Sequence, residues 1–140
     1  MCFAANLAGE AISISKTTAP HAVSYPFTAF YNVSHGHAVS LTLNKFLKFN
    51  YKNLASAKCD FDLNERFKIL FDVSKVSNFD AFDQYLIKLR DNAKLENNFE
   101  KLGIDINKNY STIISSVNSQ RLANNPVDLN LEDLKKIIQS

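Results

Sequence analysis

Glycine and proline are both scarce in this chain. Three glycines (Gly9, Gly36 and Gly103) occur in 140 residues, whereas average usage would give about ten. No two of them lie close enough to form a glycine-rich phosphate-binding loop. Only three prolines interrupt the sequence. Because glycine and proline are the residues that most often end helices and strands, their scarcity argues against a turn-dense all-β fold and favours helices.

Cysteines, net charge and long apolar runs are also limited. Cys2 and Cys59 lack metal-ligand spacing and do not make a disulfide scaffold, so we expect a reducing, cytoplasmic compartment. The net charge of +2 is too small to indicate a nucleic-acid partner. No apolar run reaches the roughly 18 residues of a membrane span, and the first residues lack the basic flank of a signal peptide. We therefore expect neither nucleic acid nor membrane as a partner.

The remaining sequence is typical of one helical domain. Hydrophobic residues make up 46% and charged residues 21%, close to the globular average. The spacing of apolar residues predicts an all-α fold, with Ser34, Ser77 and Asn130 as helix N-caps. The predicted helices span residues 4–15, 21–31, 35–48, 63–73, 77–94, 110–122 and 131–138. Five aromatic residues are expected in the core: Phe67, Phe71, Phe79, Phe82 and Tyr85.

Two of these predicted helices have unusual composition. The first carries five small residues, which suggest close packing against another helix: Ala4, Ala5, Ala8, Gly9 and Ala11. The second contains Pro26, which we expect to distort it.

All three histidines fall within 17 positions: His21, His35 and His37. On one straight helix His21 and His35 would lie about 21 Å apart, but a turn at residues 32–34 can fold two helices together so that both rings point into one gap. His37 lies about 200° around the helix from His35 and should not join them. The position of His35 in the first turn disfavours its protonation, which suits a metal ligand. Two imidazoles are fewer than the three or four ligands of a catalytic site, so partly buried structural histidines are the alternative interpretation.

Longer motifs surround these histidines. Residues 20–27 (PHAVSYPF) and 29–39 (AFYNVSHGHAV) resemble the C-terminal domain of iron-containing (group III) alcohol dehydrogenases, a superfamily that includes glycerol dehydrogenase and dehydroquinate synthase. Residues 16–21 (KTTAPH) resemble a branch with phosphonoacetaldehyde-reductase-like members, and residues 121–127 and 131–134 resemble the family's terminus. The resemblance covers nearly the whole chain. It implies an orthogonal bundle of several helices like the C-terminal domain of dehydroquinate synthase.

The resemblance also implies a chemistry. His21 and His35 correspond to the last two protein ligands of a divalent metal, usually iron and sometimes zinc. This metal acts as a Lewis acid on the substrate oxygen while alcohol and aldehyde interconvert by hydride transfer with NAD(P). Many members carry a further catalytic or proton-relay histidine four residues after the first, where this chain has Tyr25. Either the Tyr25 hydroxyl does related work, making it the catalytic candidate, or this branch routes protons otherwise.

Family enzymes have an N-terminal nucleotide-binding domain with a glycine-rich loop, and they take an aspartate and a further histidine as metal ligands from upstream. None of these features occurs here, so we expect residues 1–140 to form a single α-helical metal-site domain from which the N-terminal nucleotide-binding domain is absent. No NAD(P)-binding residue is assigned. The implied partners are a small alcohol or aldehyde, the nucleotide-binding domain or subunit, and a second copy of the chain in a homo-oligomer. The alternative is a non-catalytic helical module, left as a fragment, for interaction or oligomerisation.

Overall fold

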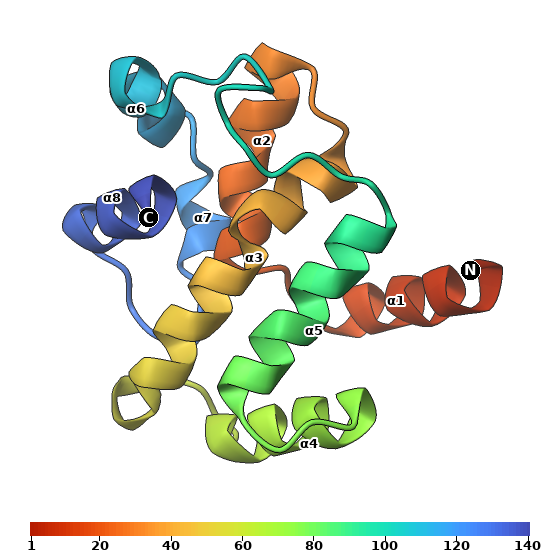
Figure 1. The fold of residues 1–140 in the computed structure, drawn as a ribbon. Coiled ribbons are helices and arrows are strands. Elements are labelled where there is room, and N and C mark those ends of the chain that lie inside the picture. Colours follow the sequence, from red (N-terminus) through yellow and green to blue (C-terminus); the bar gives the residue numbers. More distant parts are fainter.

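The computed structural model describes all residues 1–140, and it contains α-helices without any β-sheet (Figure 1). This arrangement confirms the predicted all-α class. The elements are α1 (Cys2–Ile14), α2 (Ala19–Tyr31), α3 (His35–Lys52), the short 3-10 helix η1 (Leu54–Ser56), α4 (Leu63–Ser74), α5 (Phe79–Asn92), α6 (Ile106–Ser115), α7 (Ser119–Leu122) and α8 (Leu131–Gln139).

Helices α2 and α3 form the hairpin at the centre of the fold, where they pack on each other along much of their length (Figure 1). Asn32 ends α2 in the left-handed conformation, with φ of 53°, and its backbone N–H donates to the Phe27 carbonyl. Asparagine adopts this conformation more readily than most residues because its short polar side chain can bond locally. Since α3 begins only three residues later, at His35, the start of α3 lies beside α2.

The main core is built around this hairpin. Helices α6 and α8 pack against α2 and α3, and thirteen buried apolar side chains fill the space between them. They are Ala19, Val23, Phe27, Val33, Ala38, Leu41, Phe46, Ile104, Ile106, Ile113, Leu134, Ile137 and Ile138. Burial of this apolar surface provides the main stabilisation of the fold, and it fixes the position of α2 against α3.

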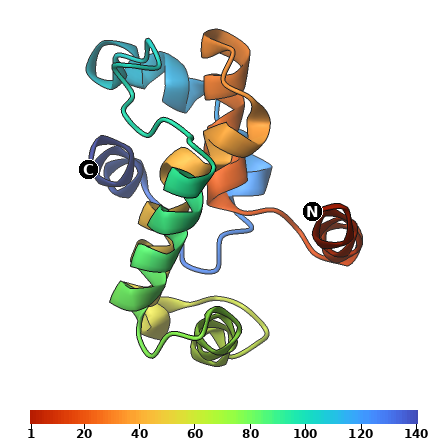
Figure 2. The same ribbon diagram turned by 45° about the vertical axis from the view of Figure 1, so that its right-hand side comes forward.

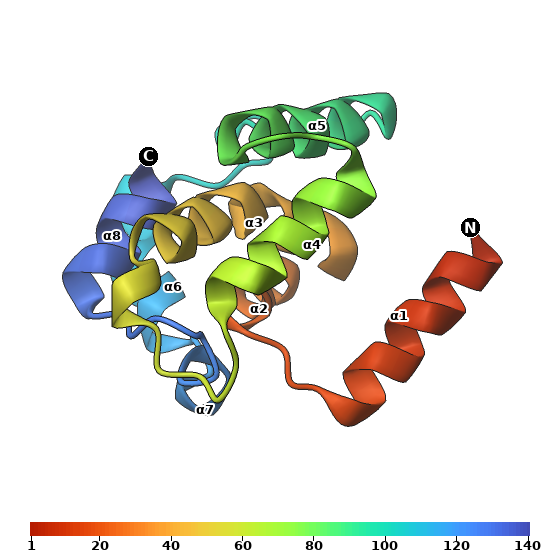
Figure 3. The ribbon, with the colours of Figure 1, turned by 90° about the horizontal axis from the view of Figure 1, so that it is seen from below.

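A second, smaller core joins α4 and α5 to α3, on the side of α3 opposite α8 (Figure 3). It holds four buried aromatic residues, as predicted: Phe67, Phe71, Phe79 and Phe82. Tyr51 of α3 stacks on Phe79, with ring centroids 4.9 Å apart. The fifth predicted member, Tyr85, lies outside this core: it is 37% exposed and its ring stacks on Phe82 alone.

Several local predictions need correction. Helix α2 runs through Pro26, whose ring is fully buried, as in the predicted helix 21–31, and the distortion expected at Pro26 stays a prediction. Ser34 lies at the N-cap of α3 without a side-chain hydrogen bond, and Asn78 rather than Ser77 caps α5. The predicted helix 110–122 is two helices, because Asn118 caps a new one, α7, with a bond from Arg121 N–H.

Helix α1 lies apart from the other helices, as Figures 2 and 3 show. None of its residues is buried, and Phe3, Leu7 and Ile14 are among the exposed apolar side chains. The predicted close packing of its small residues is therefore wrong within this chain, because no other element reaches them. No helix has both the length and the apolar character needed to cross a bilayer.

A buried polar pair connects the chain end to the central hairpin. Asn50, near the end of α3, donates to Asn125 Oδ1 at 3.2 Å, and Asn125 donates to Asn50 Oδ1 at 2.8 Å and to the Val127 carbonyl at 2.7 Å. The neighbouring Asn124 donates to the Thr17 carbonyl at 3.1 Å. These bonds hold the segment that follows α7 against α3 and against the start of α2, and so they position α7 beside α2.

Candidate metal centre

The hairpin brings the first two histidines together. His21 lies in the first turn of α2, and His35 is the first residue of α3. His21 Nδ1 lies 3.2 Å from His35 Nε2, and the ring centroids are 5.2 Å apart. Two bare imidazole lone pairs at this distance would repel each other, so the arrangement requires either a proton or a cation between the two nitrogens.

Ser24 contacts both histidines through its hydroxyl group. It lies one turn after His21 on α2, and its side chain is fully buried. The Ser24 hydroxyl donates to the His21 carbonyl at 2.8 Å, and its oxygen lies 3.3 Å from His35 Nδ1. Both ring nitrogens of His35 therefore have a defined neighbour, and both neighbours belong to α2.

Tyr25 and Arg121 border the same group. The Tyr25 ring lies 5.4 Å from the His35 ring, and the residue is 37% exposed. Arg121 of α7 donates to Tyr25 Oη, and its guanidinium lies over the Tyr25 ring at 4.8 Å from the centroid. Because Arg121 occupies an acceptor position of Tyr25 Oη, the proton of that hydroxyl remains available to another acceptor.

The electrostatics of the group favour a neutral His21. Burial lowers the pKa of His21 below its usual value, and the neighbouring His35 and Arg121 lower it further by repelling a positive charge. A neutral imidazole is the form that binds metals. No carboxylate lies in the group to oppose this effect, since Arg121 takes part in none of the ion pairs.

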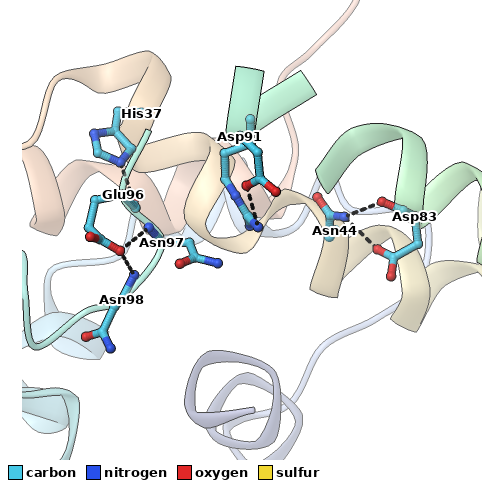
Figure 4. A network of polar contacts seen from close by, with 8 residues as sticks. His37, Asn44, Asp83, Asp91, Glu96, Asn97 and Asn98 are labelled. Carbon is cyan, nitrogen blue, oxygen red and sulfur yellow. Dashed lines mark hydrogen bonds and ion pairs between the residues drawn. The ribbon is translucent and has the colours of Figure 1, made fainter. Parts of the chain in front are cut away.

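His37 is directed away from the pair. Its Nε2–H donates to the carbonyl of Glu96, in the segment that follows α5. Figure 4 shows this contact beside the Glu96 carboxylate, which accepts from the backbone N–H groups of Asn97 and Asn98. His37 therefore holds this loop against α3, and the expectation that it lies apart from His21 and His35 agrees with the structure.

The histidine pair faces an open surface. None of the five larger cavities is lined by His21, His35 or Tyr25, and the largest, about 700 Å³, lies between α3, α6 and α8. Beside His35, a Cβ placed on Gly36 would meet no atom within 4 Å. No group of three histidine, cysteine or carboxylate side chains comes together anywhere in the chain. This chain therefore contributes one side of a site, with two candidate metal ligands.

Comparison with known proteins identifies the family to which this chain belongs. The family model described as Fe-containing alcohol dehydrogenase family, C-terminal, matches residues 1–140. The chain belongs to the Fe-containing alcohol dehydrogenase family. Its all-helical fold is consistent with the C-terminal domain of that family, and the family supports an alcohol-dehydrogenase-like oxidoreductase.

A curated relative carries a more specific name. Phosphonoacetaldehyde reductase from Streptomyces viridochromogenes is 42% identical to this chain over 48 residues, which are 34% of this chain and 12% of the relative. The match therefore spans about an eighth of that enzyme, and it agrees with the branch that residues 16–21 resemble. No solved structure matches the chain.

The donor atoms of the pair fit a metal of this family in kind and in spacing. Imidazole nitrogen is a good ligand for iron and zinc. Two nitrogens bound to one ion at about 2.0–2.1 Å, with an angle of about 90–109° between them, lie about 2.8–3.4 Å apart. The observed 3.2 Å falls within this range. The number of ligands does not suffice, because two imidazoles leave at least one position to be filled from outside this chain.

Sequence reasoning missed two neighbours of the pair. Ser24 had a usable signal, because residues three apart share a helix face and it follows His21 by three. Arg121 had none, since it lies 96 positions from Tyr25 and reaches it only through the packing of α7 on α2.

Proposed function

We propose that this chain is the metal-ligating helical part of an NAD(P)-dependent oxidoreductase that interconverts an alcohol and an aldehyde. The observation that carries the proposal is the pair of facing imidazole nitrogens of His21 and His35, in a chain that belongs to the Fe-containing alcohol dehydrogenase family. When bound, iron or zinc would supply Lewis acidity toward the substrate oxygen.

The residues of the chain have distinct roles in this proposal. His21 Nδ1 and His35 Nε2 are the two metal ligands. Tyr25 Oη, whose proton Arg121 leaves available, gives a proton to the substrate oxygen in the reductive direction and takes it back in the oxidative one. The open face of the pair supports a partner, the nucleotide-binding domain, which would carry NAD(P) and the remaining ligands.

Metal titration tests the ligand assignment directly. Purified chain would be titrated with Co(II), Zn(II) and Fe(II) under anaerobic conditions, following cobalt absorbance and heat of binding. His21→Ala and His35→Ala should each weaken binding strongly, because each removes half of the ligands. His37→Ala is the matched control, since the His37 ring bonds to the Glu96 carbonyl and not to the histidine pair, and its loss should leave the affinity unchanged. Equal binding by wild type and the double variant H21A/H35A would refute the assignment.

The position of Arg121 bears on the charge of the substrate. We infer that the aldehyde carries an anionic group, because an exposed guanidinium without a carboxylate partner lies beside the metal pair. A positive charge there opposes cation binding, so a negative substrate group would offset it. The name of the curated relative points the same way, since phosphonoacetaldehyde carries a phosphonate.

Methylphosphonate is a suitable probe of this anion site. Chemical shifts of the ¹⁵N-labelled chain would be followed during titration, with ethanol as the uncharged comparison. Arg121→Gln should abolish the shifts around Tyr25. Arg66→Gln is the matched control, because Arg66 also lies over an exposed aromatic ring, Phe61, at 5.3 Å. Shifts that survive in R121Q, or that also vanish in R66Q, would refute a specific role of Arg121.

A second candidate function belongs to another class, and the exposure of α1 favours it. Four apolar side chains project from this helix, namely Phe3, Leu7, Ile12 and Ile14, and exposed apolar patches mark association sites. In this alternative the chain is a non-catalytic module that forms oligomers through α1. Light scattering after size exclusion should then show a homo-oligomer that Leu7→Asp plus Ile14→Asp converts to a monomer. A monomeric wild-type chain would refute this alternative.

A further inference from the structure

The Ser24 hydroxyl bonds to the His21 backbone carbonyl and lies within hydrogen-bond distance of the His35 ring, and these contacts determine where protons lie. A serine hydroxyl has one proton and two acceptor lone pairs. The His21 carbonyl, 2.8 Å away, can only accept, so the Ser24 proton is used in that bond. The contact of 3.3 Å between Ser24 Oγ and His35 Nδ1 must then have the imidazole as the donor.

The tautomer of His35 follows from this argument. A neutral imidazole carries one N–H, and Ser24 places it on Nδ1. His35 Nε2 therefore keeps its lone pair, and this is the nitrogen that faces His21 Nδ1 at 3.2 Å. In the metal-free chain His21 Nδ1–H can donate to that lone pair. With a cation held between the rings, His21 would carry its proton on Nε2, on the far side of its ring, and both facing nitrogens would be free to serve as ligands.

We propose that Ser24 is a positioning residue that holds His35 in the Nδ1–H tautomer and so presents the Nε2 lone pair to a divalent cation. This inference deepens the proposed function, on which its metal-binding part rests. Ser24 is fully buried and bonded to the His21 carbonyl, which supports the assignment because the acceptor oxygen is held in place beside Nδ1. Groups that orient metal-bound histidines in this way typically contribute about 10–100-fold to metal affinity.

Nitrogen NMR tests the tautomer without any metal. Long-range ¹H–¹⁵N correlation spectra of the metal-free chain, recorded at pH 8, distinguish the protonated ring nitrogen from the bare one. We expect wild-type His35 to be protonated at Nδ1, and Ser24→Ala to convert it to a mixture of tautomers or to the Nε2–H form. A wild-type His35 protonated at Nε2, or an unchanged Nδ1–H tautomer in S24A, would overturn the proposal.

Co(II) titration of the same variants measures the consequence for the metal. S24A should bind about 10–100-fold more weakly than wild type. Ser40→Ala is the matched control, because the Ser40 hydroxyl donates to the His37 carbonyl at 2.7 Å, the same bond three residues back on α3, without a contact to the histidine pair. S40A should keep the wild-type affinity within twofold. An S24A affinity equal to that of S40A would overturn the metal-binding part.

The two measurements separate this inference from the function on which it rests. If wild-type chain binds no cobalt while His35 still shows the Ser24-dependent tautomer, the metal assignment fails and the positioning role of Ser24 stands. If cobalt binds through His21 and His35 while S24A changes neither readout, the metal assignment stands and the role of Ser24 fails. Circular dichroism melting of S24A and S40A establishes that both variants are folded.

Discussion

The buried pair of Asn50 and Asn125 offers the sharpest test of how the fold positions the site. Asn50→Ala removes two side-chain hydrogen bonds, of 3.2 and 2.8 Å. Each such bond contributes about 0.5–1.5 kcal/mol, and the Asn125 Oδ1 left without a donor costs about 1–3 kcal/mol more. Both residues are nearly inaccessible, at 5% and 6% exposure, so water cannot replace the lost donor. We expect a total loss of about 2–6 kcal/mol.

Urea unfolding followed by circular dichroism measures this loss, and for a domain of this size it corresponds to a melting temperature lower by roughly 6–18 °C. Asn97→Ala is the control, because Asn97 is exposed and its side-chain amide makes no hydrogen bond; only its backbone N–H does. The effect of this substitution on the free energy of unfolding should stay within about 0.5 kcal/mol. The double variant N50A/N125A should lose less than the sum of the two single variants, because both remove the same bonds. A loss in N50A no larger than in N97A, or strict additivity, would refute the reasoning.

Three further predictions concern stability. Phe27→Ala, at a fully buried core position, should lower the free energy of unfolding by about 3–5 kcal/mol in the same urea assay; a change under 1 kcal/mol would contradict the core described above. Asn130→Ala, which removes the capping box of α8 formed with Asp133, should cost about 1 kcal/mol, whereas no change in melting temperature would mean that the cap is not formed in solution. The lowered pKa of His21 means that the unfolded chain binds more protons than the folded one as pH falls below about 6.5. Acidification should therefore lower the melting temperature of metal-free wild type more than that of His21→Gln. A melting-temperature difference between these two proteins that stays constant from pH 8 to pH 5.5 would contradict this prediction.

The sequence predicted the helical class and most helices well, because apolar spacing reflects burial directly. The capping of α8 by Asn130 could be predicted for a local reason, since the bonds join residues only three apart. The splitting of the predicted helix 110–122 was missed because a helical apolar pattern continues across Asn118, whose side chain accepts from Arg121 N–H instead. The predicted helix 21–31 does contain Pro26, because tertiary packing overrides the tendency of proline to end a helix.

The candidate site likewise has features that the sequence could predict and others that it could not. The meeting of His21 and His35 could be anticipated, because it needs only a short turn between two helices, and Asn32 and Val33 provide it. Their role as metal ligands, and that of Tyr25 in catalysis, came from the family resemblance and stay predictions. Arg121 could not be foreseen, because its place beside Tyr25 depends on Asn124 and Asn125 anchoring the distant end of the chain.

The unfilled space at Gly36 has an evolutionary consequence. Glycine within a helix is less stable than alanine by about 0.5–1 kcal/mol, and an added methyl group at Gly36 would encounter no steric obstacle. Selection for stability alone would thus favour alanine at this position. Directed evolution of the chain for heat resistance should readily yield Gly36→Ala. That variant would show whether the space beside His35 is occupied by another molecule during the proposed reaction.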